Sequence, residues 1–321
     1  MELSTPDDAQ PKARPRRSCL AVPGSSPKML GKAPGLPADD VFLDLEDSVA
    51  PGEKEAARGN VITALRDHDW GDKTVVVRIN AIDTHWAYRD VIEIVEAAGE
   101  HLDCIMIPKV QAPGEVEFVD HLLRMIEDTK GLDHRIGIEA QIENGPGLTL
   151  IDEIAHASDR LETLIFGPGD MAAALGMRSL TVGEILPDYP GDHWHWVLMR
   201  ILVAARTAGL QAIDGPYAKI HDAEGYREVA RRSQLLGFDG KWVLHPSQIE
   251  VANEVYAPNQ EEFERAEDIL AAYRQATEVD ARGAVMFGDE MIAEASRKMA
   301  EVTSMRGRAA GMRARPADRR G

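Results

Sequence analysis

The sequence predicts an α/β fold, a (β/α)8 TIM barrel with a small C-terminal helical lid domain. Eight short apolar runs recur along the chain, and the segments between them carry helical periodicity or are long enough to hold a helix. Repeated strand-helix units are the signature of this barrel, in which catalytic groups lie at the carboxyl ends of the strands. The predicted strands are 19–22, 41–45, 75–79, 104–107, 136–142, 164–166, 212–213 and 242–244.

The length of the chain allows one barrel and one small additional domain. Its 321 residues exceed the roughly 250 residues of a typical barrel of this kind. We expect a disordered leader over 1–15, the barrel over 16–257, the lid domain over 258–305 and a disordered tail over 306–321. Within the lid, Asn259 is expected to cap a helix that runs to about Val279, and a second helix is expected from about Glu290.

The composition argues against several classes of function. A formal net charge of −18 disfavours binding to nucleic acid or to an anionic membrane, because phosphate groups would be repelled. No apolar run approaches the roughly 18 to 20 residues of a membrane span. Cys19 and Cys104 are too few for a disulfide framework and have no metal-ligand spacing. These observations indicate a cytoplasmic protein with no nucleic-acid or membrane partner.

Charged residues stand at the ends of the predicted strands, where the active site of such a barrel lies. The second strand ends in Asp44, Glu46 and Asp47, and alternation along a strand places Asp44 and Glu46 on one face. Such a cluster is costly to leave unpaired, so it indicates a cation or a ring of hydrogen bonds. Arg78 ends the third strand, and its guanidinium can hold a carboxylate through two parallel hydrogen bonds.

Glu143 and Asp170 follow the fifth and sixth strands and could together hold one Mg²⁺. This ion is usually bound by one or two carboxylates, with water and substrate oxygens completing its shell. Each carboxylate alone is also explained as a helix N-cap or a surface ion pair; jointly, with Arg78 at the same mouth, they favour the metal. His245, after the eighth strand, could be an acid or base, but a tight turn with Ser247 also explains it.

Several longer segments form motifs in register. They are RSCLAVPG at 17–24, FLDLEDSVAP at 42–51, VRIN at 77–80, IPK at 107–109 and GKWVLHPSQI at 240–249, together with WGDKT at 70–74, DTH at 83–85, YRD at 88–90 and DGP at 214–216. The first five resemble the citrate lyase beta subunit and malyl-CoA lyase superfamily, and the last four resemble its malyl-CoA lyase branch. The match covers about residues 16 to 300 and is far more specific than any single motif.

The resemblance implies a Mg²⁺-dependent Claisen-type lyase, with Mn²⁺ able to take the place of Mg²⁺. Such an enzyme cleaves or forms a β-hydroxyacyl-CoA such as L-malyl-CoA or β-methylmalyl-CoA, with acetyl-CoA or propionyl-CoA and glyoxylate as the other reactants. Carried over by motif, Glu143 and Asp170 bind the metal, Arg78 holds the carboxylate end, the Glu46–Asp47 pair orders metal-bound water, and Arg17, Ser18 and Lys28 contact the phosphates of coenzyme A.

The chain departs from this family where the family places its acid or base. Members carry an aspartate in the lid and supply it to a neighbouring subunit, but this position is Ala293; Glu294 follows it and is the remaining candidate. On a helix the next residue is turned by about 100°. A second departure is Tyr217, Ala218 and Lys219, where Phe, Gly and Asp are usual.

These departures leave three functions open. The first is a lyase in which Glu294, Asp289 or metal-bound hydroxide transfers the proton. The second is a β-hydroxyacyl-CoA thioesterase acting on malyl-CoA, with a citramalyl-CoA lyase as a variant of the first. The third is a non-catalytic CoA-binding homologue. Because the family lid acts across subunits, the resemblance also implies a homo-oligomer, a trimer or a hexamer.

Overall fold

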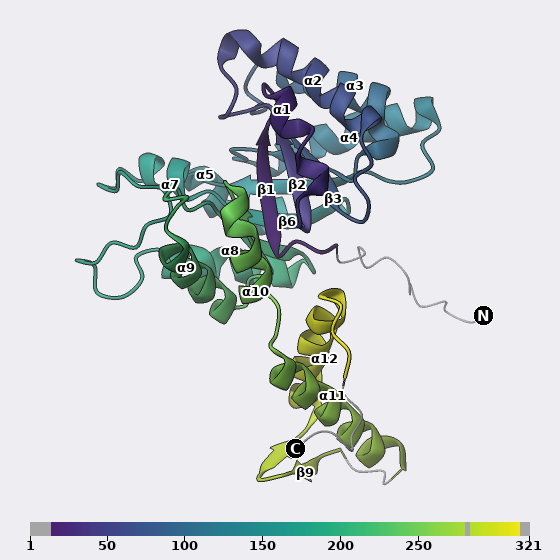
Figure 1. Ribbon diagram of the computed structural model, residues 1–321, viewed down its shortest axis with the longest axis vertical. Helices are drawn as coiled ribbons and strands as arrows, with labels where there is room; N and C mark the ends of the chain where they lie inside the picture. Colours follow the sequence, from purple (N-terminus) through teal and green to yellow (C-terminus); the bar gives the residue numbers. More distant parts are fainter. Residues whose placement is uncertain (1–13, 280–282, 315–321) are drawn as a thin grey trace. The chain divides into compact units, whose positions relative to one another are not determined.

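The computed structural model describes residues 14–279 and 283–314 of the chain. These residues form two units, one that ends at Tyr256 and one that begins at Ala257 (Figure 1). Residues 1–13 of the expected leader and residues 315–321 of the expected tail lie outside the described residues. None of the helices in the described part of the chain is long and apolar enough to cross a membrane.

Eight parallel strands close into a barrel in the first unit, in the order in which they occur in the sequence, and β1 pairs with β8. They are β1 Ser18–Pro23, β2 Asp40–Asp44, β3 Thr74–Arg78, β4 Cys104–Ile107, β5 Gly137–Ile142, β6 Leu161–Phe166, β7 Gln211–Asp214 and β8 Gly240–Val243. Each predicted run overlaps one of these strands, so the TIM barrel prediction is confirmed. The register sets Asp44 on β2 opposite Arg78 on β3.

Helices connect the strands of the barrel (Figure 1). They are α1 Pro27–Leu30, α2 Lys54–Asp67, α3 Ala87–Ala98, α4 Pro113–Lys130, α5 Gly145–Thr149, α6 Ile151–Ala155, α7 Pro168–Ala174, α8 His195–Thr207, α9 Ala223–Leu236 and α10 Ile249–Val255. Asp222 caps α9 by accepting a hydrogen bond from the Gly225 N–H at 2.9 Å. Gly131 ends α4 with a φ of 66°, a conformation that glycine adopts without strain.

Two apolar clusters hold the barrel together. The larger one lies between the sheet and the helices. The smaller one fills the inside of the barrel, because alternate residues of each strand face inward; it consists of Cys19, Phe42, Val76, Cys104, Met106, Ile165, Ile213 and Trp242. The rings of Phe42 and Trp242 have centroids 4.4 Å apart. We call this tilted pair of rings the aromatic layer.

Charged side chains are also buried inside the barrel, between the aromatic layer and the amino ends of the strands. Arg16 donates from Nε to Oε1 of Glu139 at 2.8 Å and lies 3.7 Å from Oδ2 of Asp40. Burial raises the pKa of Asp40, and the Glu139 charge adds to the rise. Arg14 also lies here, in an ion pair with Asp103. The leader prediction is therefore wrong at Arg14, because this side chain is fixed against the barrel.

The second unit contains two long helices and a β-hairpin. Its elements are α11 Gln260–Arg274, a π-helical turn η5 Gln275–Val279, β9 Val285–Phe287, β10 Glu290–Ile292 and α12 Glu294–Ala309. Asn259 caps α11 as predicted: its side chain accepts from the Glu262 N–H at 2.8 Å. The Glu262 carboxylate in turn accepts from the Asn259 N–H at 2.9 Å, which completes a capping box.

Two details of this unit correct the sequence predictions. Glu290 begins a strand and not a helix, because β10 pairs antiparallel with β9, with Met291 opposite Met286. Gly288, with a φ of 59°, supplies the left-handed residue that the tight hairpin turn requires. The helix begins at Glu294 and continues to Ala309, so the expected disordered tail is helical over its first four residues, 306–309.

Candidate active site

The carboxyl ends of β2 and β3 meet in a buried ion pair. Arg78 donates from Nε to Oδ1 of Asp44 at 2.7 Å and from Nη2 to Oδ2 at 2.8 Å. The guanidinium lies 5.1 Å from the ring centre of Trp242, over the aromatic layer. The two parallel bonds that Arg78 can offer to a carboxylate are thus taken by Asp44. The remaining nitrogen, Nη1, lies 3.4 Å from Oε2 of Glu46.

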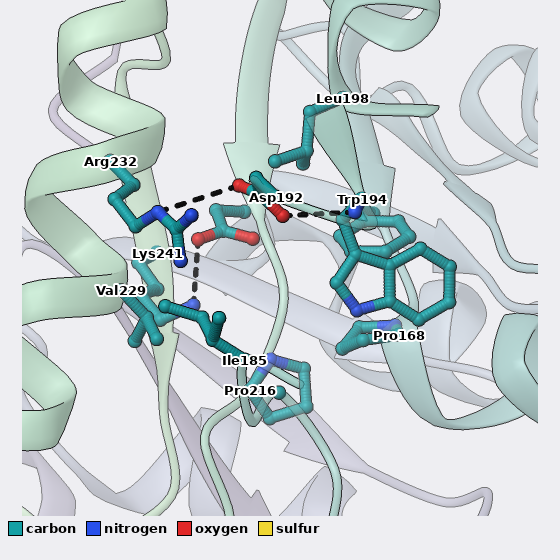
Figure 2. Close-up of a pocket in the computed structure, with 12 residues that line it drawn as sticks. Pro168, Ile185, Asp192, Trp194, Leu198, Pro216, Val229, Arg232 and Lys241 are labelled. Atoms are coloured by element: carbon teal, nitrogen blue, oxygen red, sulfur yellow. Dashed lines mark hydrogen bonds and ion pairs between the residues drawn. The ribbon is translucent and has the colours of Figure 1, made fainter. Parts of the chain in front are cut away.

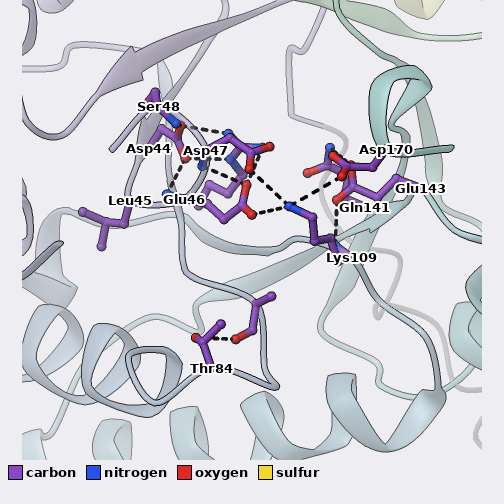
Figure 3. A network of polar contacts seen from close by, with 12 residues as sticks. Asp44, Leu45, Glu46, Asp47, Ser48, Thr84, Lys109, Gln141, Glu143 and Asp170 are labelled. Atoms are coloured by element: carbon purple, nitrogen blue, oxygen red, sulfur yellow. Dashed lines mark hydrogen bonds and ion pairs between the residues drawn. The ribbon is translucent and has the colours of Figure 1, made fainter. Parts of the chain in front are cut away.

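Lys109, two residues beyond the end of β4, joins the carboxylates of the mouth (Figure 3). Its Nζ donates to Glu46, lies 3.2 Å from Oδ1 of Asp47 and lies 3.8 Å from Oδ1 of Asp170. Burial lowers the pKa of Lys109, but the hydrogen bond to Glu46 and the carboxylate charges outweigh burial, so the pKa is raised. The ammonium group therefore stays charged among the carboxylates.

Lys109 is a site residue that reasoning from the sequence missed. Its backbone is left-handed, with a φ of 54°, which is uncommon for a residue other than glycine. This conformation accompanies a hydrogen bond from its N–H to Oε1 of Glu143 at 2.8 Å. Two signals were available, its place just after the fourth strand and its position in the IPK motif at 107–109, but no rule of local sequence predicts a left-handed lysine.

Glu143 is buried directly after β5 and beside the start of α7. Its Oε2 accepts a hydrogen bond from Nε2 of Gln141 at 2.8 Å. Burial raises the pKa of the Glu143 carboxyl to about 8, and the charge of Asp170 adds to the rise. Gly167 makes this placement possible, because a Cβ at position 167 would lie only 2.3 Å from Oε2 of Glu143. The absence of a side chain at 167 thus leaves the space that Glu143 fills.

Glu143 and Asp170 fit a single divalent cation. Repulsion between two carboxylates at a buried site is relieved by a cation between them, and hard oxygen ligands suit Mg²⁺ or Mn²⁺. Across residues 14–279 and 283–314, no group of three or more His, Cys, Asp or Glu side chains is arranged to hold a metal. The protein therefore offers two carboxylates, and water and substrate oxygens would supply the other ligands, which is the usual pattern for Mg²⁺.

The residues expected to contact coenzyme A do not lie together. Ser18 begins β1 and is buried, with its hydroxyl donating to Oδ1 of Asn253 at 2.7 Å. The side chain of Arg17 forms two hydrogen bonds with Asp39, at 2.7 and 2.8 Å. Both stand at the amino end of β1, opposite the mouth, which contradicts their expected role. Lys28 is exposed on α1, directly after the carboxyl end of β1, so its role as a phosphate contact stays a prediction.

Residues 17–246 match the model of the HpcH/HpaI aldolase/citrate lyase family. The chain belongs to this family. It is 42% identical over 301 residues to the L-malyl-CoA/β-methylmalyl-CoA lyase of Cereibacter sphaeroides, across 91% of this chain and 94% of that protein. It is 37% identical to a (3S)-malyl-CoA thioesterase of the same organism, across 83% of this chain and 85% of the relative.

A solved structure of this kind is CitE from Mycobacterium tuberculosis, in complex with magnesium, acetoacetate and coenzyme A. The two chains superpose with a TM-score of 0.71 at 32% identity, across 94% of this chain and 99% of CitE. The predicted resemblance to the citrate lyase beta subunit and malyl-CoA lyase superfamily is therefore confirmed.

The second unit of this HpcH/HpaI family chain carries Ala293 and Glu294. Glu294 is the first residue of α12 and is half-exposed, and hydrogen bonds from Arg297 lower the pKa of its carboxyl to about 2. It also accepts a hydrogen bond from the Tyr273 hydroxyl at 3.2 Å. A carboxylate with so low a pKa is a weak base. Glu294 in this state is therefore poorly suited to the proton transfer that the sequence suggested for it.

Asp214, at the end of β7, accepts hydrogen bonds from β8, from α9 and from the loop after β7. Its Oδ2 accepts from Nζ of Lys241 at 2.7 Å and from the Ser233 hydroxyl at 2.9 Å, and its Oδ1 accepts from the Gly215 N–H at 2.8 Å. The adjoining cavity, whose lining includes Pro168, Trp194 and Lys241 (Figure 2), measures about 30 Å³, enough for about one water molecule and too small for a substrate. Asp214 thus fixes the loop after β7.

Two of the residues that depart from the family pattern, Ala218 and Lys219, contact the long loop after α7. The Ala218 N–H donates to the carbonyl oxygen of Val182 at 3.0 Å, and Lys219 forms an ion pair with Glu184. Gly183, with a φ of 79°, packs so closely that a Cβ would lie 2.1 Å from the carbonyl oxygen of Pro216. The changed residues therefore join two loops that follow neighbouring strands.

Proposed function

We propose that this protein is a Mg²⁺-dependent carbon-carbon lyase that cleaves or forms a β-hydroxyacyl-CoA. L-Malyl-CoA or β-methylmalyl-CoA would give acetyl-CoA or propionyl-CoA and glyoxylate. The observation that carries the proposal is the buried Glu143 carboxyl beside Asp170, with the cations Arg78 and Lys109 at the same mouth. The lyase relative and the magnesium and coenzyme A complex of mycobacterial CitE support it.

Cleavage breaks the bond between the α and β carbons of the hydroxyacyl group. The β-hydroxyl loses its proton and becomes the aldehyde of glyoxylate. The electron pair of the broken bond passes to the enolate of the thioester, which then takes up a proton at its α carbon. A magnesium ion held by Glu143 and Asp170 would supply Lewis-acid polarisation of substrate oxygens.

The side chains of the mouth position the reactants. Because Asp44 fixes the guanidinium of Arg78, Nη1 is held in one orientation and can hold the carboxylate end of the substrate. Glu46 and Asp47, both bonded to Lys109, would orient a water molecule at the site. Burial raises the pKa of Glu46, which brings this carboxyl closer to the range of a general base.

A second candidate function is hydrolysis of the same thioester. Ala293 cannot transfer a proton, and the carboxyl of Glu294 has a pKa of about 2. A thioesterase needs no acid at that position if water attacks the thioester carbonyl and expels the coenzyme A thiol. The similarity to a (3S)-malyl-CoA thioesterase supports this alternative.

The test is to incubate the purified full chain with L-malyl-CoA and Mg²⁺. Glyoxylate would be trapped with phenylhydrazine, while free thiol is measured in a parallel sample. A lyase releases glyoxylate and acetyl-CoA without thiol, and Glu143→Gln abolishes the release. Thiol and malate without glyoxylate would identify the thioesterase. The same assay with citramalyl-CoA, read as pyruvate, tests the citramalyl-CoA lyase, and no product from any of them would favour the non-catalytic homologue.

The assembly is also a proposal. We expect a cytoplasmic homo-oligomer, a trimer or a hexamer, because the family resemblance places the C-terminal unit on a neighbouring subunit. Light scattering of the full chain gives the mass directly, and a monomer of 35.2 kDa at micromolar concentration would contradict the expectation.

A further inference from the structure

The mouth of the barrel contains more carboxylates than one magnesium ion requires. Glu46 and Asp47 follow β2, and Glu143 and Asp170 follow β5 and β6. These four carboxylates form two pairs, and one or two carboxylates are what Mg²⁺ usually takes from a protein. A second divalent cation could therefore compete for the pair Glu46 and Asp47.

The ammonium group of Lys109 lies between the carboxylates that follow β2 and the carboxylate of Asp170 that follows β6 (Figure 3). It bonds Glu46 and Asp47 on one side and lies 3.8 Å from Oδ1 of Asp170 on the other. Among the described residues, two other cations lie near the mouth: Arg78 keeps two of its nitrogens on Asp44. Lys54 donates to the carbonyl oxygens of Leu45 and Glu46. Lys109 is therefore the positive group that touches both the β2 carboxylates and the carboxylate after β6.

The backbone N–H and carbonyl groups of Lys109 are also hydrogen-bonded. Its N–H donates to Glu143 at 2.8 Å, and its carbonyl oxygen accepts from Nδ2 of Asn144 at 3.2 Å. The left-handed φ of 54° carries a conformational cost for a lysine. A backbone conformation of this kind persists only where surrounding contacts hold it in place. The backbone of Lys109 is thus fixed at the mouth, and its ammonium group is held there by the bonds to Glu46 and Asp47.

We propose that Lys109 is a resident cation that takes the place of a second metal ion and keeps this a one-metal site. Its ammonium repels any divalent cation from the Glu46–Asp47 carboxylates, so that one ion binds, at Glu143 and Asp170. Lys109 is thus a positioning residue: it keeps Glu46 and Asp47 free of metal while it fixes them. This proposal shares one assumption with the proposed function, namely that a metal ion binds at Glu143 and Asp170.

The experiment counts metal ions and does not depend on turnover. Mn²⁺ is the probe, because its unpaired electrons report free and bound ion by electron paramagnetic resonance. We expect one Mn²⁺ per protomer in the native protein and in Lys109→Arg. We expect two in Lys109→Met, close enough to give a spin-coupled spectrum. Lys130→Met, which removes an exposed lysine at the end of α4, is the matched control and should bind one.

The outcomes separate the two proposals. Two ions in the native protein, or one ion in a folded Lys109→Met variant, would overturn the role of Lys109 and leave the lyase proposal intact. No bound ion in the native protein would overturn the metal site itself, and with it both proposals. Lys109→Gln repeats the test if the methionine variant does not fold. Adding Glu46→Gln to either variant should return the count to one.

Discussion

Arg78 and Asp44 face each other across β2 and β3 and share two parallel hydrogen bonds of 2.7 and 2.8 Å. Both side chains are buried. Burial raises the pKa of Asp44, but the charge and hydrogen bonds of Arg78 outweigh it and lower the pKa to about 2. The pair is therefore ionised throughout the neutral range, and it fixes the guanidinium that the substrate is expected to meet.

Asp44→Asn should destabilise the barrel. The amide cannot balance the buried charge of Arg78, and breaking a buried pair from one side typically costs about 3–5 kcal/mol. Urea unfolding monitored by circular dichroism measures the difference. Asp47→Asn is the matched control, because the Asp47 side chain is 56% exposed and contributes about 1 kcal/mol or less. Equal losses in both variants would contradict the importance of the buried pair.

Metal binding should release a proton from Glu143. Because its pKa is raised to about 8, this carboxyl is mostly protonated at pH 7 in the metal-free protein and must lose its proton to bind a cation. We expect about one proton per Mg²⁺ at pH 7 and none at pH 9.5. Calorimetry in buffers with different ionisation enthalpies measures the release. Release that is the same at both pH values would argue against a raised pKa.

The same carboxyl should make the metal-free protein less stable as the pH rises. Between about 4.5 and 8 the folded state keeps a proton on Glu143 that the unfolded state has released. The unfolded state then binds fewer protons, so the contribution of this group to stability is present at low pH and falls through that window. Thermal unfolding of Glu143→Gln, compared with the native protein at each pH, isolates the effect, and a constant difference between the two would refute it.

Gly167→Ala should weaken metal binding. The new Cβ would lie 2.3 Å from Oε2 and 2.4 Å from Cβ of Glu143, so the carboxylate must move. Changes that displace a ligand's support commonly cost about 10- to 100-fold in metal affinity. Titration calorimetry with Mg²⁺ or Mn²⁺ provides the measurement. Gly59→Ala in α2, where a Cβ meets nothing within 4 Å, is the control and should leave affinity unchanged.

Ala293→Asp should restore the lyase rate if the family acid is what this chain lacks. Ala293 has an extended backbone at the N-cap of α12, where Asp and Asn both stabilise a helix by about 1 kcal/mol over Ala. Only Asp can transfer a proton, which is worth about 10²- to 10⁴-fold in rate. Glyoxylate release therefore separates Ala293→Asp from Ala293→Asn, while both raise the unfolding midpoint. Equal rates in the two variants would show that position 293 has no catalytic part.

The strands could be predicted from the sequence because both the inward and the outward faces of barrel strands are buried. This gives nearly continuous apolar runs such as Cys104–Ile107, whose predicted and observed bounds agree. β6 was predicted too short, because Glu162 interrupts its apolar run at a point where its register with β5 shifts. Glu143 and Asp170 could be placed at one mouth because neighbouring parallel strands end at the same edge.

Other features of the site depend on three-dimensional context. Arg78 was assigned to a substrate, since a linear sequence does not show that the strand register gives its two parallel bonds to Asp44. Ser18 was expected to contact a phosphate of coenzyme A near the first-strand loop, but the length of β1 separates Ser18 from that loop. The left-handed backbone of Lys109 follows from contacts with residues far away in sequence, so local propensity could not indicate it.

The aromatic layer of Phe42 and Trp242 lies between two clusters of buried charged side chains inside the barrel. Arg78 and its carboxylates lie on one side, and Arg16, Glu139 and Asp40 lie on the other. The hydrogen bonds of Arg78 are made to Asp44, and those of Arg16 are made to other carboxylates on the far side of the rings. A substitution at the mouth can therefore change the hydrogen-bond partners there while the ion pairs at the opposite end of the barrel stay intact.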